Sequence, residues 1–246
     1  MKPSNCIPTF FASLFVTGTL FLASCRKMHV PPPAIITKNA IAYVYNSDST
    51  DAIAFKALLL ENDCPVTLIP KAKAATTDYK NYQLIVIDHN TDFAGGGLWT
   101  KSDAEAIKAS GKRMLLMGIG GLIFSSKLGN DANWDNAGQF NETSFSVTDK
   151  TAAYLITPYV IAIPTSTPAV TLYPTAGMAS GQQAPSGVLN NNILIGKFWT
   201  ASTYYPVTLE KNQYMVFGFH SGVQNMTTNG RNFIVNLCYF MGKFVL

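Results

Sequence analysis

The stretch from Arg113 to Leu122 constrains the fold of this chain more than any other part. An apolar run ends there on a glycine-rich turn, and a second apolar segment follows without a break. This pattern predicts a buried strand that stops at Gly118, Gly120 and Gly121, and then a short helix. Glycine permits backbone conformations that other residues avoid, and the first amides of a helix can face a ligand. In α/β proteins such a corner often carries a nucleophile, but no Cys, Ser or Thr stands on this turn.

The residues before this corner predict alternating strands and helices. Apolar runs at 40–45, 65–70 and 84–88 are typical of buried strands, and the spacing of apolar residues predicts a helix over 52–62. Ser102 and Glu105 match a capping box and predict a helix that ends at Gly111. The alternation with short connections predicts an α/β fold: a flavodoxin-like, doubly wound, mainly parallel sheet with helices on both faces.

The second half of the chain is richer in β-forming residues. Residues 130–141 predict a long loop, and residues 225–243 predict a final amphipathic helix. Between them, short runs punctuated by proline predict strands at 159–163, 170–173, 193–198, 207–209 and 214–219. No repeat or linker interrupts residues 40–246, so we expect one domain there.

The ends of the predicted parallel strands indicate where a ligand would bind. In doubly wound sheets, ligands lie outside the carboxyl ends of the strands. The candidate residues of this cleft are Asn46, Ser47, Asp48, Asp88, His89, Asn90 and His220. The two histidines and Asp88 are also candidates for a metal site or an acid–base pair, but their spacing is not diagnostic. We expect a polar pocket without a metal or a cofactor.

The N-terminus has the pattern of an export signal. A basic start precedes an apolar run from Ile7 to Ala23, which is shorter than the ~20 residues of a membrane span. The run ends in Leu22-Ala-Ser-Cys25, which resembles the signal of bacterial lipoproteins. The resemblance implies cleavage of residues 1–24 and lipidation of Cys25, with 25–39 as a proline-rich spacer. An ordinary signal peptide with a chance cysteine is the alternative.

This resemblance also implies a location and excludes some partners. If the source is Gram-negative, Arg26, by analogy with sorting in enteric bacteria, favours the outer membrane of the cell envelope, facing the periplasm or the surface. The formal charge is only +4, and no dense basic patch appears, so we expect no nucleic-acid partner. Two cysteines, Cys64 and Cys238, remain in the domain. We expect them to be free and buried, although an export route permits a disulfide.

Three short motifs resemble the class I glutamine amidotransferase-like superfamily. They are Gly118-Ile-Gly-Gly121, Phe217-Gly-Phe-His220 and the segment from Met226 to Asn236. Active members of that superfamily have Gly-Ile-Cys-x-Gly at the elbow, and Phe-His-Pro-Glu before a final helix containing Thr-x-x-Gly. The resemblance places the nucleophile position on Gly120, where we expect a strained or left-handed backbone, and the base position on His220. The Pro and Glu positions fall on Ser221 and Gly222, and the second elbow glycine falls on Leu122, or on Gly121 if the turn is one residue tighter.

These departures predict that the domain is degenerate. Gly120 has no side chain with which to attack, and Gly222 offers no carboxylate to orient His220. We therefore expect a binding or assembly module whose partner is a small molecule, a glycan or a protein. The alternative is a hydrolase or transferase that acts on an amide or a glycan, with His89 or His220 as base.

Residues 131–142 contain a further candidate site. Oxygen-bearing residues stand at positions 1, 3, 5 and 12 of a possible calcium loop that ends on Glu142. Asn136 occupies the position where a calcium loop requires glycine, and 143–147 is typical of a strand rather than an exit helix. We favour a solvated loop anchored by Trp134 over a calcium site.

Overall fold

The computed structural model describes residues 39–46, 49–92, 98–129, 138–147, 149–166, 168–183 and 192–244. The predicted signal peptide, Cys25 and the spacer lie outside these ranges, as do Ser47, Asp48 and Trp134. No helix in the described ranges has the length and apolarity needed to span a membrane.

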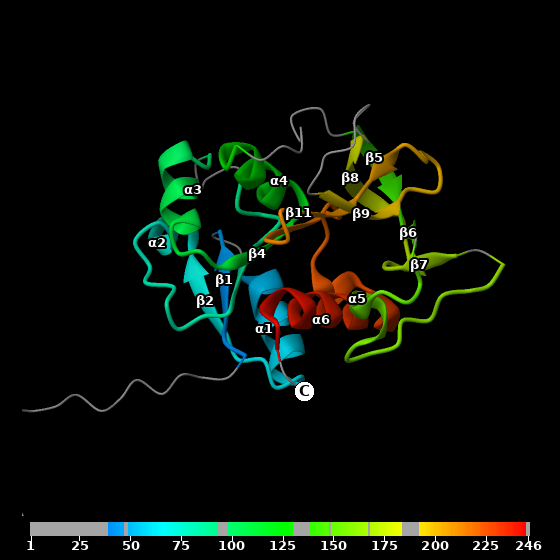
Figure 1. Cartoon of the computed structure of the whole chain (residues 1–246), viewed down its shortest axis with the longest axis horizontal. Helices are drawn as coiled ribbons and strands as arrows, with labels where there is room; N and C mark the ends of the chain where they lie inside the picture. Colours follow the sequence, from blue (N-terminus) through cyan, green and yellow to red (C-terminus); the bar gives the residue numbers. More distant parts are fainter. Residues whose placement is uncertain are drawn as a thin grey trace, which may run out of the picture. The chain divides into compact units, whose positions relative to one another are not determined.

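A mixed sheet forms the centre of the domain (Figure 1). Within the described ranges it has nine strands in the order β2-β1-β3-β4-β12-β11-β9-β6-β7. The first five are parallel: β2 (Val66–Pro70), β1 (Ile41–Tyr45), β3 (Leu84–Ile87), β4 (Arg113–Met117) and β12 (Tyr214–Phe217). The others pair antiparallel: β11 (Val207–Glu210), β9 (Asn192–Lys197), β6 (Ser144–Val147) and β7 (Ala169–Thr171). The predicted α/β class, with a parallel core and a β-rich C-terminal half, is confirmed.

The parallel strands are apolar throughout because both of their faces are buried. Leu84 and Val86 of β3 face one hydrophobic core, and Ile85 and Ile87 face the other. The same alternation holds along β1 and β4. Such a strand needs apolar residues at every position, which is why a continuous run, rather than an alternating pattern, predicted it.

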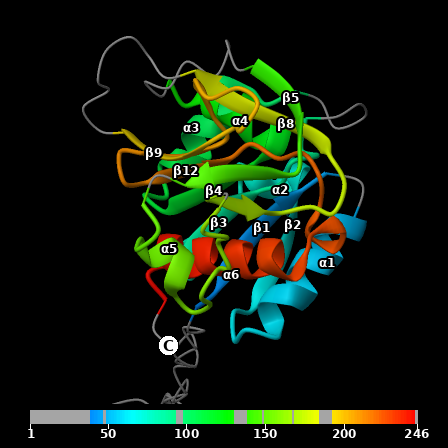
Figure 2. The ribbon, with the colours of Figure 1, turned by 90° about the vertical axis from the view of Figure 1, so that its right-hand side faces the viewer.

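Helices cover both faces of these strands (Figure 2). On one face, α1 (Thr50–Leu60) and α6 (Thr228–Gly242) contribute Phe55 and Phe233 to the larger core. On the other face lie α2 (Lys71–Ala74), α3 (Lys101–Lys108) and α4 (Gly118–Lys127). The short helices α5 (Ala153–Ile156) and η2 (Val223–Asn225) adjoin α6. The doubly wound arrangement predicted for the first half is therefore present.

Two local predictions were wrong. The capping box of α3 is formed by Thr100 and Asp103 rather than by Ser102 and Glu105, because the Asp103 amide donates to Thr100 Oγ1 (3.1 Å). The strand predicted at 159–163 is irregular backbone. Its amides bond to asparagine side chains of α6: Tyr159 N donates to Asn236 Oδ1 (3.0 Å), and Ala162 N donates to Asn229 Oδ1 (2.9 Å).

A second, three-stranded sheet stands beside the end of β12. It consists of β10 (Tyr204–Tyr205), β8 (Gly177–Gln183) and β5 (Gly138–Glu142), where a loop had been predicted for the start of β5. One side of β5 packs Phe140 against Phe198 and Tyr204, with ring centroids 4.9 and 4.8 Å apart. The Ser180 amide donates to the Gly218 carbonyl (2.8 Å), so β8 reaches the carboxyl end of the parallel strands.

Candidate functional site

The turn between β4 and α4 is the centre of the candidate site. Met117 is the last residue of β4 and Gly118 is the first residue of α4, so no loop separates them. Gly118 has φ = +50°, in the left-handed region, whereas Gly120 is not among the residues with positive φ. Of the two alternatives expected for Gly120, strained or left-handed, the left-handed one is wrong. The sharp turn falls directly after the strand, at Gly118, two residues before the predicted position.

Neither elbow glycine has room for a side chain. A Cβ atom on Gly118 would overlap His89 Cβ and lie 3.1 Å from the Phe219 carbonyl oxygen. On Gly120 it would overlap Thr91 Oγ1 and lie 2.5 Å from the Asp88 carbonyl oxygen. The Gly120 amide also donates to the His89 carbonyl (2.9 Å), which holds the turn against the end of β3. The volume that a side chain on either glycine would occupy is therefore filled, mostly by the residues that follow β3.

His89 is held between two carboxylates. Its Nδ1 lies 2.8 Å from Asp88 Oδ1, and its Nε2 lies 3.0 Å from Asp51 Oδ2 at the start of α1. A ring whose two nitrogens both face carboxylates donates from both, so it carries a proton on each. Burial lowers the pKa of His89, but the hydrogen bonds to Asp51 and Asp88 outweigh this and raise it to about 9. At neutral pH, His89 is a cation with no free nitrogen to accept a proton.

Asp51 occupies the space that a longer side chain at Gly222 would need. A Cβ atom on Gly222 would overlap Asp51 Oδ1 and approach Asp51 Cγ to 2.5 Å. Gln224 Nε2 donates to the same carboxylate. The hydrogen bond from His89 lowers the pKa of Asp51, so the carboxylate is ionised at neutral pH. A carboxylate is thus present near the expected glutamate position, but it pairs with His89 and not with His220.

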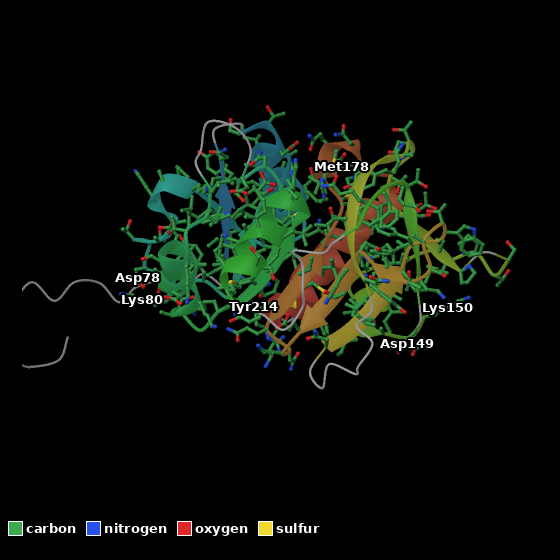
Figure 3. All side chains as sticks on the ribbon, turned by 90° about the horizontal axis from the view of Figure 1, so that it is seen from above. Asp78, Lys80, Asp149, Lys150, Met178 and Tyr214 are labelled. Atoms are coloured by element: carbon green, nitrogen blue, oxygen red, sulfur yellow. The ribbon has the colours of Figure 1, made fainter. Side chains whose placement is uncertain are left out.

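His220 faces β8 rather than a carboxylate. Its amide donates to the carbonyl of Met178, a β8 residue labelled in Figure 3 (3.1 Å), and its Nε2 lies 2.8 Å from Ser180 Oγ. The Nδ1 atom is buried and has no hydrogen-bond partner among the described residues. Burial, with a smaller contribution from the positive His89, lowers the pKa of His220 to about 4. The ring is therefore neutral, and Ser180 beside it is only 1% exposed.

Comparison with known proteins rests on the fold alone. No protein-family model matches the chain, and no curated protein sequence does. A solved structure from Thermoplasma acidophilum, assigned to a GMP synthase, matches 84% of this chain and 95% of its own with a TM-score of 0.54 at 13% identity. This chain has the class I glutamine amidotransferase-like fold. PurLQS from Thermotoga maritima matches 82% of the chain and 99% of its own with a TM-score of 0.49 at 10% identity.

In this amidotransferase-like fold, the predicted cleft is largely closed by its own contacts. The Asn46 amide donates to Asn90 Oδ1 (3.3 Å), so the ends of β1 and β3 meet as predicted. Asp88 is 0% and His89 is 7% exposed, which withdraws both from solvent. Of the described cleft residues, Asn46, Asn90 and His220 remain partly exposed.

Sequence reasoning missed three residues of the site: Asp51, Ser180 and Gln224. Asp51 directly precedes the helix predicted over 52–62 and was not a candidate, and Ser180 lies on a strand that was not predicted. The contact from Ser180 to His220 spans 40 positions, and that from Gln224 to Asp51 spans 173. No local spacing signals contacts of this length.

No thiol in the described part of the chain is ready to act as a nucleophile. Cys64 and Cys238 are both free and buried. Burial raises the pKa of Cys64 to about 11 and that of Cys238 well above its usual value. Both thiols are therefore protonated at neutral pH, and protonated thiols are poor nucleophiles.

The remaining candidates lie away from the elbow. Glu142, the last residue of the possible calcium loop, is buried in β5 and accepts a hydrogen bond from Thr200; most of that loop lies outside the described ranges. The described residues include no group of three or more ligands arranged to hold a metal ion. Trp99 is 2% exposed and donates to Thr91 Oγ1 (3.1 Å), so it anchors the segment after β3.

Proposed function

We propose that this chain is a lipid-anchored protein of the bacterial cell envelope whose amidotransferase-like domain is a non-catalytic binding or assembly module. The observation that most supports this proposal is the tight packing around the turn between β4 and α4, where side chains at Gly118 and Gly120 would have no space. An empty position awaiting a nucleophile would leave a cavity above the turn. Here the end of β3 fills that volume.

The chemistry of glutamine hydrolysis supports the non-catalytic interpretation. That reaction requires a nucleophile, a base that accepts its proton and a carboxylate that orients the base. Gly118 has no reactive side chain, and His89 is already protonated and bonded at both nitrogens. His220 is neutral, but its Nε2 is engaged with Ser180 and its Nδ1 is buried. The elbow therefore lacks a nucleophile, and the histidine that two carboxylates orient, His89, is not free to accept a proton.

The lipid anchor rests on sequence. Leu22-Ala-Ser-Cys25 at the end of the apolar segment supports cleavage before Cys25 and lipidation of its thiol. In this proposal, residues 25–39 tether the domain to the outer membrane, facing the periplasm or the surface. A tethered domain without catalysis acts by binding a small molecule, a glycan or a protein.

Glutamine turnover tests the non-catalytic part of the proposal. The purified protein is incubated with glutamine, and ammonia release is followed by a coupled assay. In parallel, intact-mass analysis after exposure to a diazo-ketone analogue of glutamine detects covalent trapping. We expect no ammonia above the blank and no adduct. Ammonia release that scales with protein concentration, or an adduct on any residue, would refute the proposal.

The contact between Ser180 and His220 favours the alternative of a serine hydrolase. Its 2.8 Å separation suits proton transfer from the hydroxyl to the ring. The burial of Ser180 opposes it, because a carbonyl substrate cannot reach the hydroxyl. A fluorophosphonate probe decides between the two. We expect the wild type to label no more than a Ser180→Ala variant, and labelling lost only in that variant would establish the hydrolase.

A further inference from the structure

Helix α1 carries apolar side chains on its outer face as well as on its inner face. Its inner residues Ala52, Phe55 and Leu59 are fully buried in the core. On the opposite side, Ile53 is 58% and Leu60 is 60% exposed, and the exposed residues Lys56 and Ala57 lie between them. These four residues, spaced i, i+3, i+4 and i+7, form one stripe, which we call the α1 stripe.

Such a stripe is unusual for a helix at the surface. A helix of a globular protein normally presents polar residues on the face opposite its core. In the α1 stripe, one lysine stands among three apolar residues. Single exposed apolar residues need no explanation, but three in one line over two turns resemble the contact row of a helix pair. The α1 stripe therefore has the character of an interface.

We propose that the α1 stripe is a homodimer contact, in which α1 packs antiparallel against α1 of a second copy. With the two-fold axis between residues 56 and 57, Ile53 faces the partner's Leu60, and Lys56 faces the partner's Ala57. The small side chain of Ala57 leaves room for the aliphatic stem of Lys56. The two apolar pairs, one on each side of the axis, are identical by symmetry, as a closed dimer requires.

The charges around the α1 stripe favour this arrangement. Lys56 and Glu61 are both exposed, and neither forms an ion pair with a described residue. In the antiparallel pair, Lys56 lies one turn from the partner's Glu61, so two opposite-charge pairs form. In a parallel pair about a two-fold axis, Lys56 would face the partner's Lys56, which is repulsive.

A second copy also fits better than a lipid surface. Glu61 and Asp63 stand beside Leu60 at the end of the α1 stripe, and Glu61 is exposed. Two carboxylates there oppose contact with anionic lipid headgroups, which attract basic residues instead. In the proposed dimer, Lys56 of the second copy lies near Glu61. The charges therefore favour a second copy of this chain over a lipid surface.

The expected dimer is weak. Helix α1 has 11 residues and is about 16 Å long, so its outer face alone is a small contact area. Stable interfaces bury roughly 800 Å² per partner. We therefore expect rapid exchange between monomer and dimer, which covalent trapping detects better than sizing does. Two packed helices with axes about 8–10 Å apart bring facing Cα atoms to within disulfide range.

Cysteine trapping in the full-length chain tests the pairing. Ala57→Cys, Ile53→Cys and Leu60→Cys are expressed in cells and treated with a mild oxidant, and disulfide-linked dimers are quantified on non-reducing gels. Lys73→Cys, an exposed position on α2, and the wild type give the background. We expect Ala57→Cys to form dimers several-fold above this background. Co-expressed Ile53→Cys and Leu60→Cys, carrying different tags, should form mixed dimers in excess of dimers of either variant with itself.

Charge reversal provides a matched control. Lys56→Glu in the Ala57→Cys background should lower the dimer yield several-fold, and the added Glu61→Lys should restore it. Equal thermal melting of these variants would show that folding is intact. A dimer yield from Ala57→Cys no higher than that from Lys73→Cys would overturn the proposal. Preferential self-linking of Ile53→Cys and of Leu60→Cys would overturn the antiparallel pairing, and a disulfide to an unrelated protein would assign the α1 stripe to another partner.

Discussion

Substitution of the elbow glycine tests the claim that the site is filled rather than merely lacking a nucleophile. Gly118 is subject to two independent constraints. Its φ of +50° disfavours any side chain, and a Cβ atom there would overlap His89 Cβ. Other glycines of the same chain isolate each constraint. Gly111 has φ = +67°, and a Cβ atom on it would meet no described atom within 4 Å, whereas Gly120 has the overlap without the positive φ.

The magnitudes follow from these differences. A left-handed conformation costs a residue with a Cβ atom about 1–2 kcal/mol, so we expect Gly111→Ala to lose about that much. Overpacking of a filled site costs about 1–3 kcal/mol, which is the loss expected for Gly120→Ala. Gly118→Ala combines both terms, and we expect it to lose about 2–5 kcal/mol. Gly118→Cys has the same backbone and a larger side chain, so it should lose at least as much.

Urea denaturation of the purified variants measures these losses. A shift of the midpoint at constant slope reports a change in the free energy of unfolding. Near-ultraviolet circular dichroism of the native state verifies that each variant is folded. The reasoning would be refuted if Gly118→Ala were no less stable than Gly111→Ala, because the overlap with His89 would then cost nothing. Glutaminase turnover by Gly118→Cys would show instead that the site can be reopened.

Three further predictions concern other parts of the chain. Because the pKa of His89 is raised to about 9, its stabilising effect is complete below its unfolded pKa of about 6.5 and is lost as the pH rises through 9. The free energy of unfolding should therefore fall by roughly 3 kcal/mol between these limits, and His89→Gln should flatten this slope; an unchanged slope in the variant would contradict the assignment. Metabolic labelling with a lipid precursor should mark the wild type and not Cys25→Ala, and unlabelled wild type in the soluble envelope fraction would exclude the anchor. Calorimetric titration should detect no tight calcium site, whereas a micromolar event abolished by Glu142→Gln would reverse that expectation.

The local features of this fold could be predicted from the sequence because they depend on residues that are close together in the chain. The apolar runs of β3 and β4 predicted strands buried on both faces, since every position of such a strand meets a core. The glycine-rich turn predicted the join of β4 and α4, and the final helix was found from its apolar spacing. The motifs also pointed to the amidotransferase-like fold, because the strand end, the turn and the last helix are each short local patterns.

The tertiary structure alone decided what the site contains. β8 could not be predicted from the sequence, because Gly177–Gln183 is mostly small and polar, without alternation, and it forms a strand only by pairing with β5 and β10. The pairing of Asp51 with His89 depends on how α1 packs across the sheet, which no spacing along the chain encodes. Tertiary packing also decides that the sharp turn falls at Gly118, two residues before the predicted position at Gly120. Sequence patterns indicate that a strand ends in a turn, but packing against the neighbouring strand end determines which glycine takes the left-handed conformation.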